Sequence, residues 1–146
     1  MNFEMWQEFL KKKVKHVCEQ SNSLVPALFL YYDTPIYKDK QVIAILITNW
    51  KKEEFLKQLP ELLSISGADG YFFAHEAWAS CSPEVLKGNI SASQSNERQE
   101  MLIFLSVKRN AEPRLFIATI NRTEEGKKVS EFIEQKEFKS RFIVEW

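Results

Sequence analysis

The sequence predicts an α+β fold, with a mostly antiparallel sheet of five or six strands and helices packed on it. Short apolar runs rich in β-branched and aromatic residues alternate with segments of helical periodicity. The chain has 146 residues and is 45% hydrophobic, which is enough to bury a substantial core. We therefore treat residues 1–146 as a single domain.

Two segments have the apolar spacing of amphipathic helices. Between residues 3 and 17 the apolar side chains form one stripe and the charged side chains take the opposite side. A second helix is expected from Asn49 or Trp50 through Leu63. Pro60 falls inside this second helix, so we expect a kink there or a separate short helix that begins at Pro60.

The expected strands are apolar runs bounded by turn residues. They cover residues 26–32, 41–48, 71–79, 101–107, 114–120 and a closing strand at 138–144. The first two strands and the pair 101–107 and 114–120 are expected to form hairpins. A third, C-terminal helix is expected at 125–135, where Val129, Phe132 and Ile133 follow helical spacing, and a strand is the open alternative for 126–136.

Most of the expected strands are apolar on both faces. In the run from Val42 to Thr48, for example, Ile43 and Ile45 oppose Val42 and Ala44. Such a sheet has to be covered on both sides. If all helices lie on one face, a partner chain has to cover the other, so we predict a homodimer that buries part of the sheet or the N-terminal helix.

Composition and charge exclude several classes of protein. Twenty basic and twenty acidic residues give a net charge of zero, without the strong positive field of a nucleic-acid binder. The basic run Lys11–Lys15 is interpreted as a solvated helix face, with a weak nucleic-acid patch as the alternative. The longest apolar runs, 24–32 and 42–48, fall short of the ~20 residues of a membrane span.

The expected setting is the cytoplasm, and no cofactor or metal is expected. The chain shows no signal-peptide pattern at its start. Cys18 and Cys81 make neither a disulfide framework nor a zinc site, and we expect both to be reduced.

The candidate site lies at the end of the strand 71–79. Strand alternation sends His75 and Glu76 to opposite faces, so they form no acid–base pair, and we interpret His75 as structural. Glu76 shares its face with Trp78, and a half-buried carboxylate requires a cation or hydrogen-bond donors. We predict that Arg98 is this cation and that Glu100 completes the network, which would pin the loop 80–99.

The residues Glu76-Ala77-Trp78, a proline-bearing loop with Pro83, and then Arg98, one intervening residue and Glu100 form a strand–loop–strand pattern. This pattern resembles a set of small uncharacterised proteins from bacteria, phages and mobile gene cassettes. The resemblance covers about the central third of the chain. It implies an accessory protein of a phage or mobile element and assigns no chemistry.

The function expected first is that of a non-enzymatic binding module with an unidentified protein partner or a second copy. Its binding residues would be Trp78, Glu76, Arg98 and Glu100, and the abundance of aromatic side chains fits an interface. The alternative is a small hydrolase or isomerase that uses Glu76, Arg98 and His75 under the 80–99 loop. A nucleic-acid binder that uses Lys11–Lys15 is the third interpretation.

Overall fold

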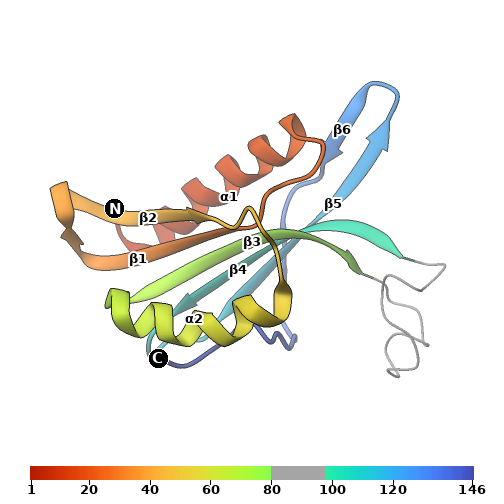
Figure 1. The fold of residues 1–146 in the computed structure, drawn as a ribbon. Helices are drawn as coiled ribbons and strands as arrows, with labels where there is room; N and C mark the ends of the chain where they lie inside the picture. Colours follow the sequence, from red (N-terminus) through yellow and green to blue (C-terminus); the bar gives the residue numbers. More distant parts are fainter. Residues whose placement is uncertain (80–97) are drawn as a thin grey trace.

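The computed structural model describes residues 1–79 and 98–146. These residues form two helices and a seven-stranded antiparallel sheet, and the predicted α+β class is confirmed (Figure 1). The elements in chain order are α1 (Phe3–Gln20), β1 (Ala27–Ile36), the short 3-10 helix η1 (Tyr37–Asp39), β2 (Lys40–Leu46), α2 (Lys52–Ser66), β3 (Gly70–Ala79), β4 (Gln99–Lys108), β5 (Arg114–Thr123), β6 (Gly126–Val129) and β7 (Ile133–Gln135). Most of the expected 80–99 loop lies outside the described residues.

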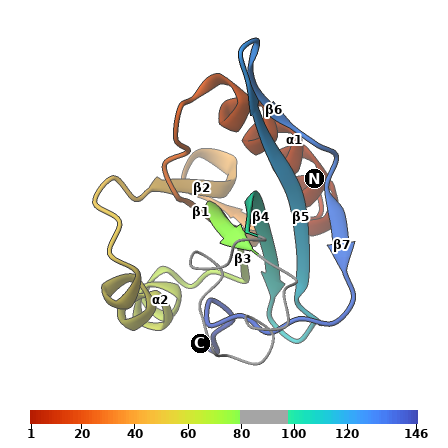
Figure 2. The same cartoon turned by 90° about the vertical axis from the view of Figure 1, so that its right-hand side faces the viewer.

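The sheet has the strand order β2-β1-β3-β4-β5-β6, and β7 also pairs with β5. Each pairing is antiparallel, and β1 with β2 and β4 with β5 are the two hairpins expected from the sequence. The β5–β6 hairpin rises beside the C-terminal end of α1 (Figures 1 and 2). The strand order leaves β2 at one end of the sheet.

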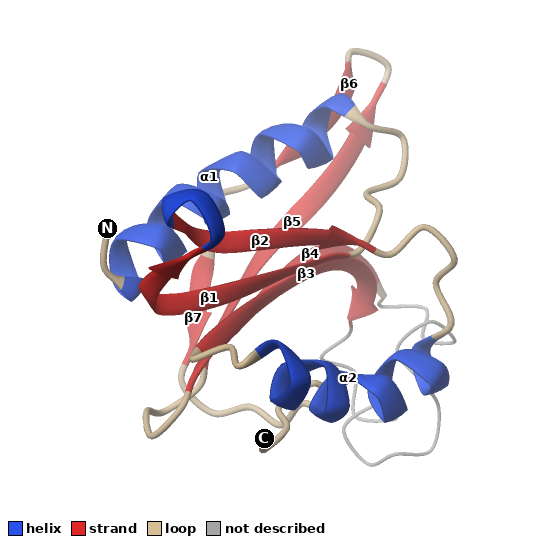
Figure 3. Ribbon diagram, turned by 60° about the vertical axis from the view of Figure 1, so that its left-hand side comes forward, coloured by secondary structure: helices blue, strands red, loops and turns tan. Residues whose placement is uncertain are grey.

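The two helices cover opposite faces of the sheet (Figure 3). Helix α1 begins after Asn2, whose side chain caps it by accepting a hydrogen bond from the Met5 amide at 2.8 Å. It buries Leu10 and Val14 against one face. Helix α2 packs on the other face, continues through Pro60 as one helix, and ends at Gly67 in the left-handed conformation that glycine accommodates.

The coverage of both faces removes the argument from which the homodimer was predicted. Since α1 and α2 lie on different faces, the chain itself covers a buried apolar cluster on each (Figure 3). The homodimer stays a prediction, and it needs a different structural reason.

The C-terminal third differs from the sequence prediction in two places. The region 125–135 is not helical: β6 and β7 occupy it, so the strand alternative is right. In the β5–β6 hairpin, residues 124 and 125 form the turn, and Gly126, the first residue of β6, has φ of 125°. Val129 pairs with Ile120 and is buried. The pairing of β6 with β5 outweighs the helical spacing of the apolar residues in this segment.

The closing strand expected at 138–144 is also absent. These residues form turns that pack Phe142 into the α2 face. The Tyr71 hydroxyl donates a hydrogen bond to the Phe142 carbonyl and accepts one from the Val144 amide at 3.2 Å. Because the buried Tyr71 hydroxyl forms hydrogen bonds with these backbone groups, the groups need no neighbouring strand as a partner.

Candidate functional site

A cluster of ionisable side chains surrounds Glu76 on the α1 face of β3. Its Oε1 atom lies 2.6 Å from Lys127 Nζ of β6, and it accepts a hydrogen bond from the Leu24 amide at 2.7 Å. The Cys18 thiol of α1 donates to the same atom at 3.5 Å. The Lys127 and Glu76 side chains are only 6% and 12% exposed, so this is a buried ion pair.

A second ion pair lies beside the first at the open end of the sheet. Arg122 of β5 binds Glu100 of β4 through two hydrogen bonds of 2.9 and 2.8 Å. The same guanidinium donates to the Asn22 carbonyl at 2.8 Å and lies 3.8 Å from Glu76 Oε2. We call Cys18, Glu76, Glu100, Arg122 and Lys127 the Glu76 cluster.

The surroundings of the cluster shift the pKa values of Glu100 and Cys18. The hydrogen bonds from Arg122 hold the pKa of Glu100 below its usual value. Burial, reinforced by the charge of Glu76, raises the pKa of the Cys18 thiol to about 11. Cys18 is therefore a protonated donor at neutral pH, and it lacks the thiolate character of a reactive cysteine.

The prediction that Arg98 is the main cation for Glu76 is wrong. The structure gives this role to Lys127, and the Arg122 guanidinium lies 3.8 Å from Glu76 Oε2. Arg98 instead lies over the ring of Trp78, with Cζ 5.1 Å from the ring centroid. The sequence-based prediction placed Trp78 and Arg98 at the same end of the sheet, as observed. It assigned the Arg98 guanidinium to the Glu76 carboxylate, whereas the guanidinium contacts the Trp78 ring.

His75 lies on the opposite face from Glu76, as the strand alternation predicts. Its ring stacks at 4.9 Å from Phe73 and lies 5.3 Å from Phe142. Burial among these rings lowers the pKa of His75 to about 4, with a smaller contribution from the positive charge of Lys52. The imidazole is therefore neutral at pH 7 and packs as an aromatic group.

The lysine run of α1 is partly paired within the chain. Lys11 Nζ lies 3.0 Å from Glu8 and 3.8 Å from the centroid of the Phe116 ring. Lys15 Nζ lies 2.8 Å from Glu131. These contacts neutralise two of the four lysines and fit the interpretation of a solvated helix face.

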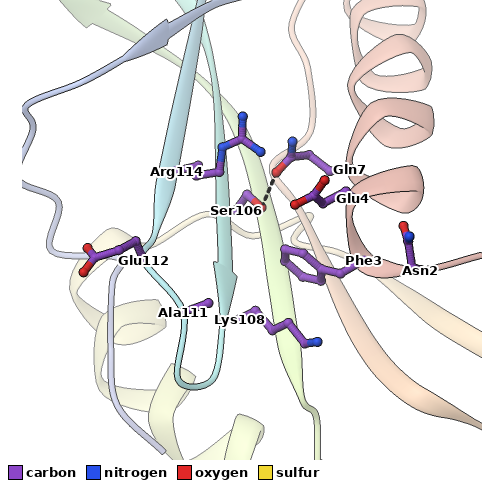
Figure 4. A pocket seen from close by; sticks show the side chains of 9 residues that line it. All are labelled: Asn2, Phe3, Glu4, Gln7, Ser106, Lys108, Ala111, Glu112 and Arg114. Atoms are coloured by element: carbon purple, nitrogen blue, oxygen red, sulfur yellow. Dashed lines mark hydrogen bonds between the residues drawn. The ribbon is translucent and has the colours of Figure 1, made fainter.

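A hollow of about 310 Å³ opens between the start of α1 and strands β4 and β5 (Figure 4). The buried Gln7 accepts a hydrogen bond from the buried Ser106 hydroxyl at 2.7 Å, and these two side chains form the floor of the hollow. The cations of its wall are used elsewhere, since Arg114 pairs with Glu134 and Lys108 with Asp33. The hollow therefore offers a ligand little unused positive charge.

Sequence reasoning missed Lys127 and Arg122, although strand alternation carried the signal. Each lies two residues from a buried residue of the α1 face, Val129 for Lys127 and Ile120 for Arg122. The same spacing connects Glu100 to the buried Leu102. On each of the three strands β4, β5 and β6, the row of apolar residues on the α1 face thus ends with a charged residue. Recognising β6 as a strand would have revealed the cluster.

Comparison with known proteins adds no assignment. No protein-family model matches the chain, and neither a curated protein nor a solved structure matches it. The resemblance carried by Glu76, Arg98 and Glu100 stays a prediction. Within residues 1–79 and 98–146, no three acidic, histidine or cysteine side chains are grouped to hold a metal, and no helix is long and apolar enough to cross a membrane.

Proposed function

We propose that this chain is a non-enzymatic protein-binding module whose contact surface includes Trp78 and Arg98. The exposure of Trp78 carries this proposal. Trp78 is 47% exposed, whereas the other three tryptophans are partly buried. Tryptophan and arginine are among the side chains enriched at the energetic centres of protein interfaces.

The contact between the two side chains favours recognition. The Arg98 guanidinium lies over the Trp78 ring, and this cation–π contact favours the observed arrangement of both groups. Side chains that are already ordered lose less conformational entropy when a partner binds. The pair is therefore a preorganised contact point at the end of β3 and β4.

The Glu76 cluster supports a structural role for the carboxylates beside this surface. A general base has to reach its substrate and be free to accept a proton. The Glu76 carboxylate instead accepts hydrogen bonds from Lys127 and from the Leu24 amide in a largely buried position. This arrangement favours the binding module over the hydrolase or isomerase alternative, and we infer that Glu76 and Glu100 hold the surface in shape.

The proposal extends to the setting of the protein. The resemblance to small proteins of bacteria, phages and mobile gene cassettes fits an accessory protein that acts in the cytoplasm through a partner. Its partner would be another protein, because the paired Lys11 and Lys15 weaken the case for a nucleic-acid surface.

Photo-crosslinking tests the proposal directly. A photoreactive phenylalanine analogue replaces Trp78 in the cells that express the protein, and Ile65, an exposed residue of α2, carries the same analogue as the control. We expect one partner to crosslink from position 78 and not from position 65.

The purified partner then allows a quantitative test. Trp78→Ala should weaken its affinity by about 30-fold, equivalent to a hot-spot loss of about 2 kcal/mol, while Ile65→Ala leaves it unchanged. Equal affinity for the wild type and Trp78→Ala would overturn the proposed surface. A chemical turnover lost in Glu76→Gln would favour the enzyme instead.

A further inference from the structure

Among the strands that the structure describes, none pairs with the outer edge of β2, which lies at one end of the sheet. The amide of Ile47 donates to the Pro26 carbonyl at 2.9 Å, and the β1–β2 register continues from this pair through Leu28 with Ile45. In an antiparallel ladder, backbone groups point alternately toward and away from the neighbouring strand. The odd-numbered residues therefore face β1, and Val42, Ala44 and Leu46 direct their N–H and C=O groups outward.

The side chains along this edge are apolar on both faces. Val42, Ala44 and Leu46 lie on the α1 face, and Ile43 and Ile45 lie on the α2 face. Ala44 is exposed, and Leu46 is 63% exposed. Natural edge strands are usually protected by charged residues, proline or a covering loop. Between residues 42 and 46 this edge has no charge and no proline.

The sequence of the edge is nearly palindromic. Val42-Ile43-Ala44-Ile45-Leu46 has isoleucine on both sides of a central alanine and a branched aliphatic residue at each end. Two antiparallel strands related by a two-fold axis place residues of the same face opposite one another. An axis at Ala44 therefore sets Ile43 against Ile45 and Val42 against Leu46, so each apolar side chain meets another.

We propose that β2 pairs antiparallel with β2 of a second copy of this chain, with the two-fold axis at Ala44. The outward backbone groups of Val42, Ala44 and Leu46 then bond to those of the partner and extend the sheet across both copies. This proposal goes beyond the proposed function, because the surface lies on a different strand from Trp78.

The surroundings of the edge provide further contact for the second copy. A hollow of about 150 Å³ lies between β2 and α2, and its apolar lining includes Ile45, Phe55 and Leu62. In the proposed register, Ile43 of the second copy lies opposite Ile45 and therefore beside this hollow. A stable interface requires about 1,000 Å² or more, so we expect side chains beside the paired strands to be buried together with them.

Light scattering at micromolar concentration tests the interface. We expect the wild type to have twice the 17.2 kDa mass of a single chain. Ala44→Lys leaves the exposed side chain of the monomer in solvent but sets two like charges against each other at the axis, so this variant should be a monomer. Ile133→Lys makes a comparable change at an exposed residue of β7 and should remain a dimer.

A cysteine crosslink tests the register. In a Cys81→Ser background, Ala44→Cys should form an intermolecular disulfide, because opposing Cα atoms at such a position lie about 5.5 Å apart, within the range a disulfide spans. Lys40→Cys should not crosslink, because residue 40 lies opposite Thr48 in this register. A monomeric wild type, or an Ala44→Lys variant that remains a dimer, would overturn the proposal. Neither result affects the proposed function, since the test of Trp78 uses a separate surface.

Discussion

The two faces of this sheet differ in whether they bury an ion pair. The α2 face is lined by stacked aromatic rings, and even His75 takes part as a neutral ring between Phe73 and Phe142. The α1 face includes two buried polar contacts, between Gln7 and Ser106 and between Glu76 and Lys127. Adjacent residues of one strand, His75 and Glu76, therefore experience opposite environments.

This difference shows what each face requires of its residues. Apolar packing tolerates small shifts in the position of a helix, whereas a buried polar group needs its partner at hydrogen-bond distance. The polar contacts of the α1 face connect α1 and the linker after it to β3, β4 and β6. We infer that they fix where α1 lies on the sheet, whereas the tyrosine hydroxyls of the α2 face, on Tyr32 and Tyr71, bond to backbone groups and not to charged side chains.

The largest expected effect is loss of the buried cation on the α1 face. Lys127→Met removes the main partner of Glu76 and leaves its carboxylate buried beside an apolar side chain. We expect the free energy of unfolding to fall by about 3–5 kcal/mol, as for other broken buried ion pairs. Urea unfolding measures the loss, and Lys128→Met, a change at the exposed neighbouring lysine, should have little effect.

The next expected effect is on the α2 face and depends on pH. The pKa of His75 is lowered to about 4 in the folded chain, so only the unfolded chain takes up this proton between about pH 6.5 and pH 4. The contribution of neutral His75 to the free energy of unfolding is complete above about pH 6.5. It is lost as the pH falls toward 4, and the total loss is about 3 kcal/mol. Unfolding experiments across this range should show a shallower pH dependence in His75→Phe.

The exposed histidine provides the control for this experiment. His16→Gln changes a ring on the outer side of α1 and should keep the wild-type pH dependence. If His75→Phe kept it as well, the neutral, buried state of His75 would be contradicted.

A smaller effect is expected at the floor of the α1-side hollow. Ser106→Ala removes the hydroxyl that donates to the buried Gln7, and the amide oxygen loses this partner (Figure 4). The expected loss in unfolding free energy is about 1–3 kcal/mol. The double variant Gln7→Leu and Ser106→Ala should recover part of it, because it removes both polar groups.

The smallest effect is expected at an exposed ion pair of similar geometry. Arg141 binds Glu53 through hydrogen bonds of 2.9 and 2.8 Å, but both side chains are exposed. Solvent and salt screen such a pair, so Arg141→Ala should leave the unfolding midpoint unchanged within error. A loss as large as that of Lys127→Met would show that burial is not what distinguishes the Glu76 cluster.

The sequence predicted the elements that rest on local periodicity. Helix α1 and strand β3 follow from apolar spacing, and the alternation along β3 correctly separated His75 from Glu76. The segment 138–144 could not be assigned in this way, because its backbone is held by the hydroxyl of the distant Tyr71. Contacts of this kind depend on the tertiary fold and leave no local pattern.

The candidate site was predicted in part for the same reason. The need of Glu76 for a cation follows from its apolar neighbours, but the identity of that cation depends on which strand lies beside it. Lys127 lies 51 residues away on β6, a strand for which the sequence also allowed a helix. Arg98 was nearer in sequence, and the fold places it over Trp78 instead.

A double-mutant cycle on Glu76 and Lys127, measured by urea unfolding, tests the structural role of the Glu76 cluster most directly. Glu76→Gln keeps an oxygen that accepts the Leu24 amide but removes the charge. We predict that Lys127→Met alone costs about 3–5 kcal/mol and that the double variant lies within about 1 kcal/mol of the wild type, because no unpaired charge remains buried. Losses that simply add would show that the two charges are independent and would contradict a structural ion pair.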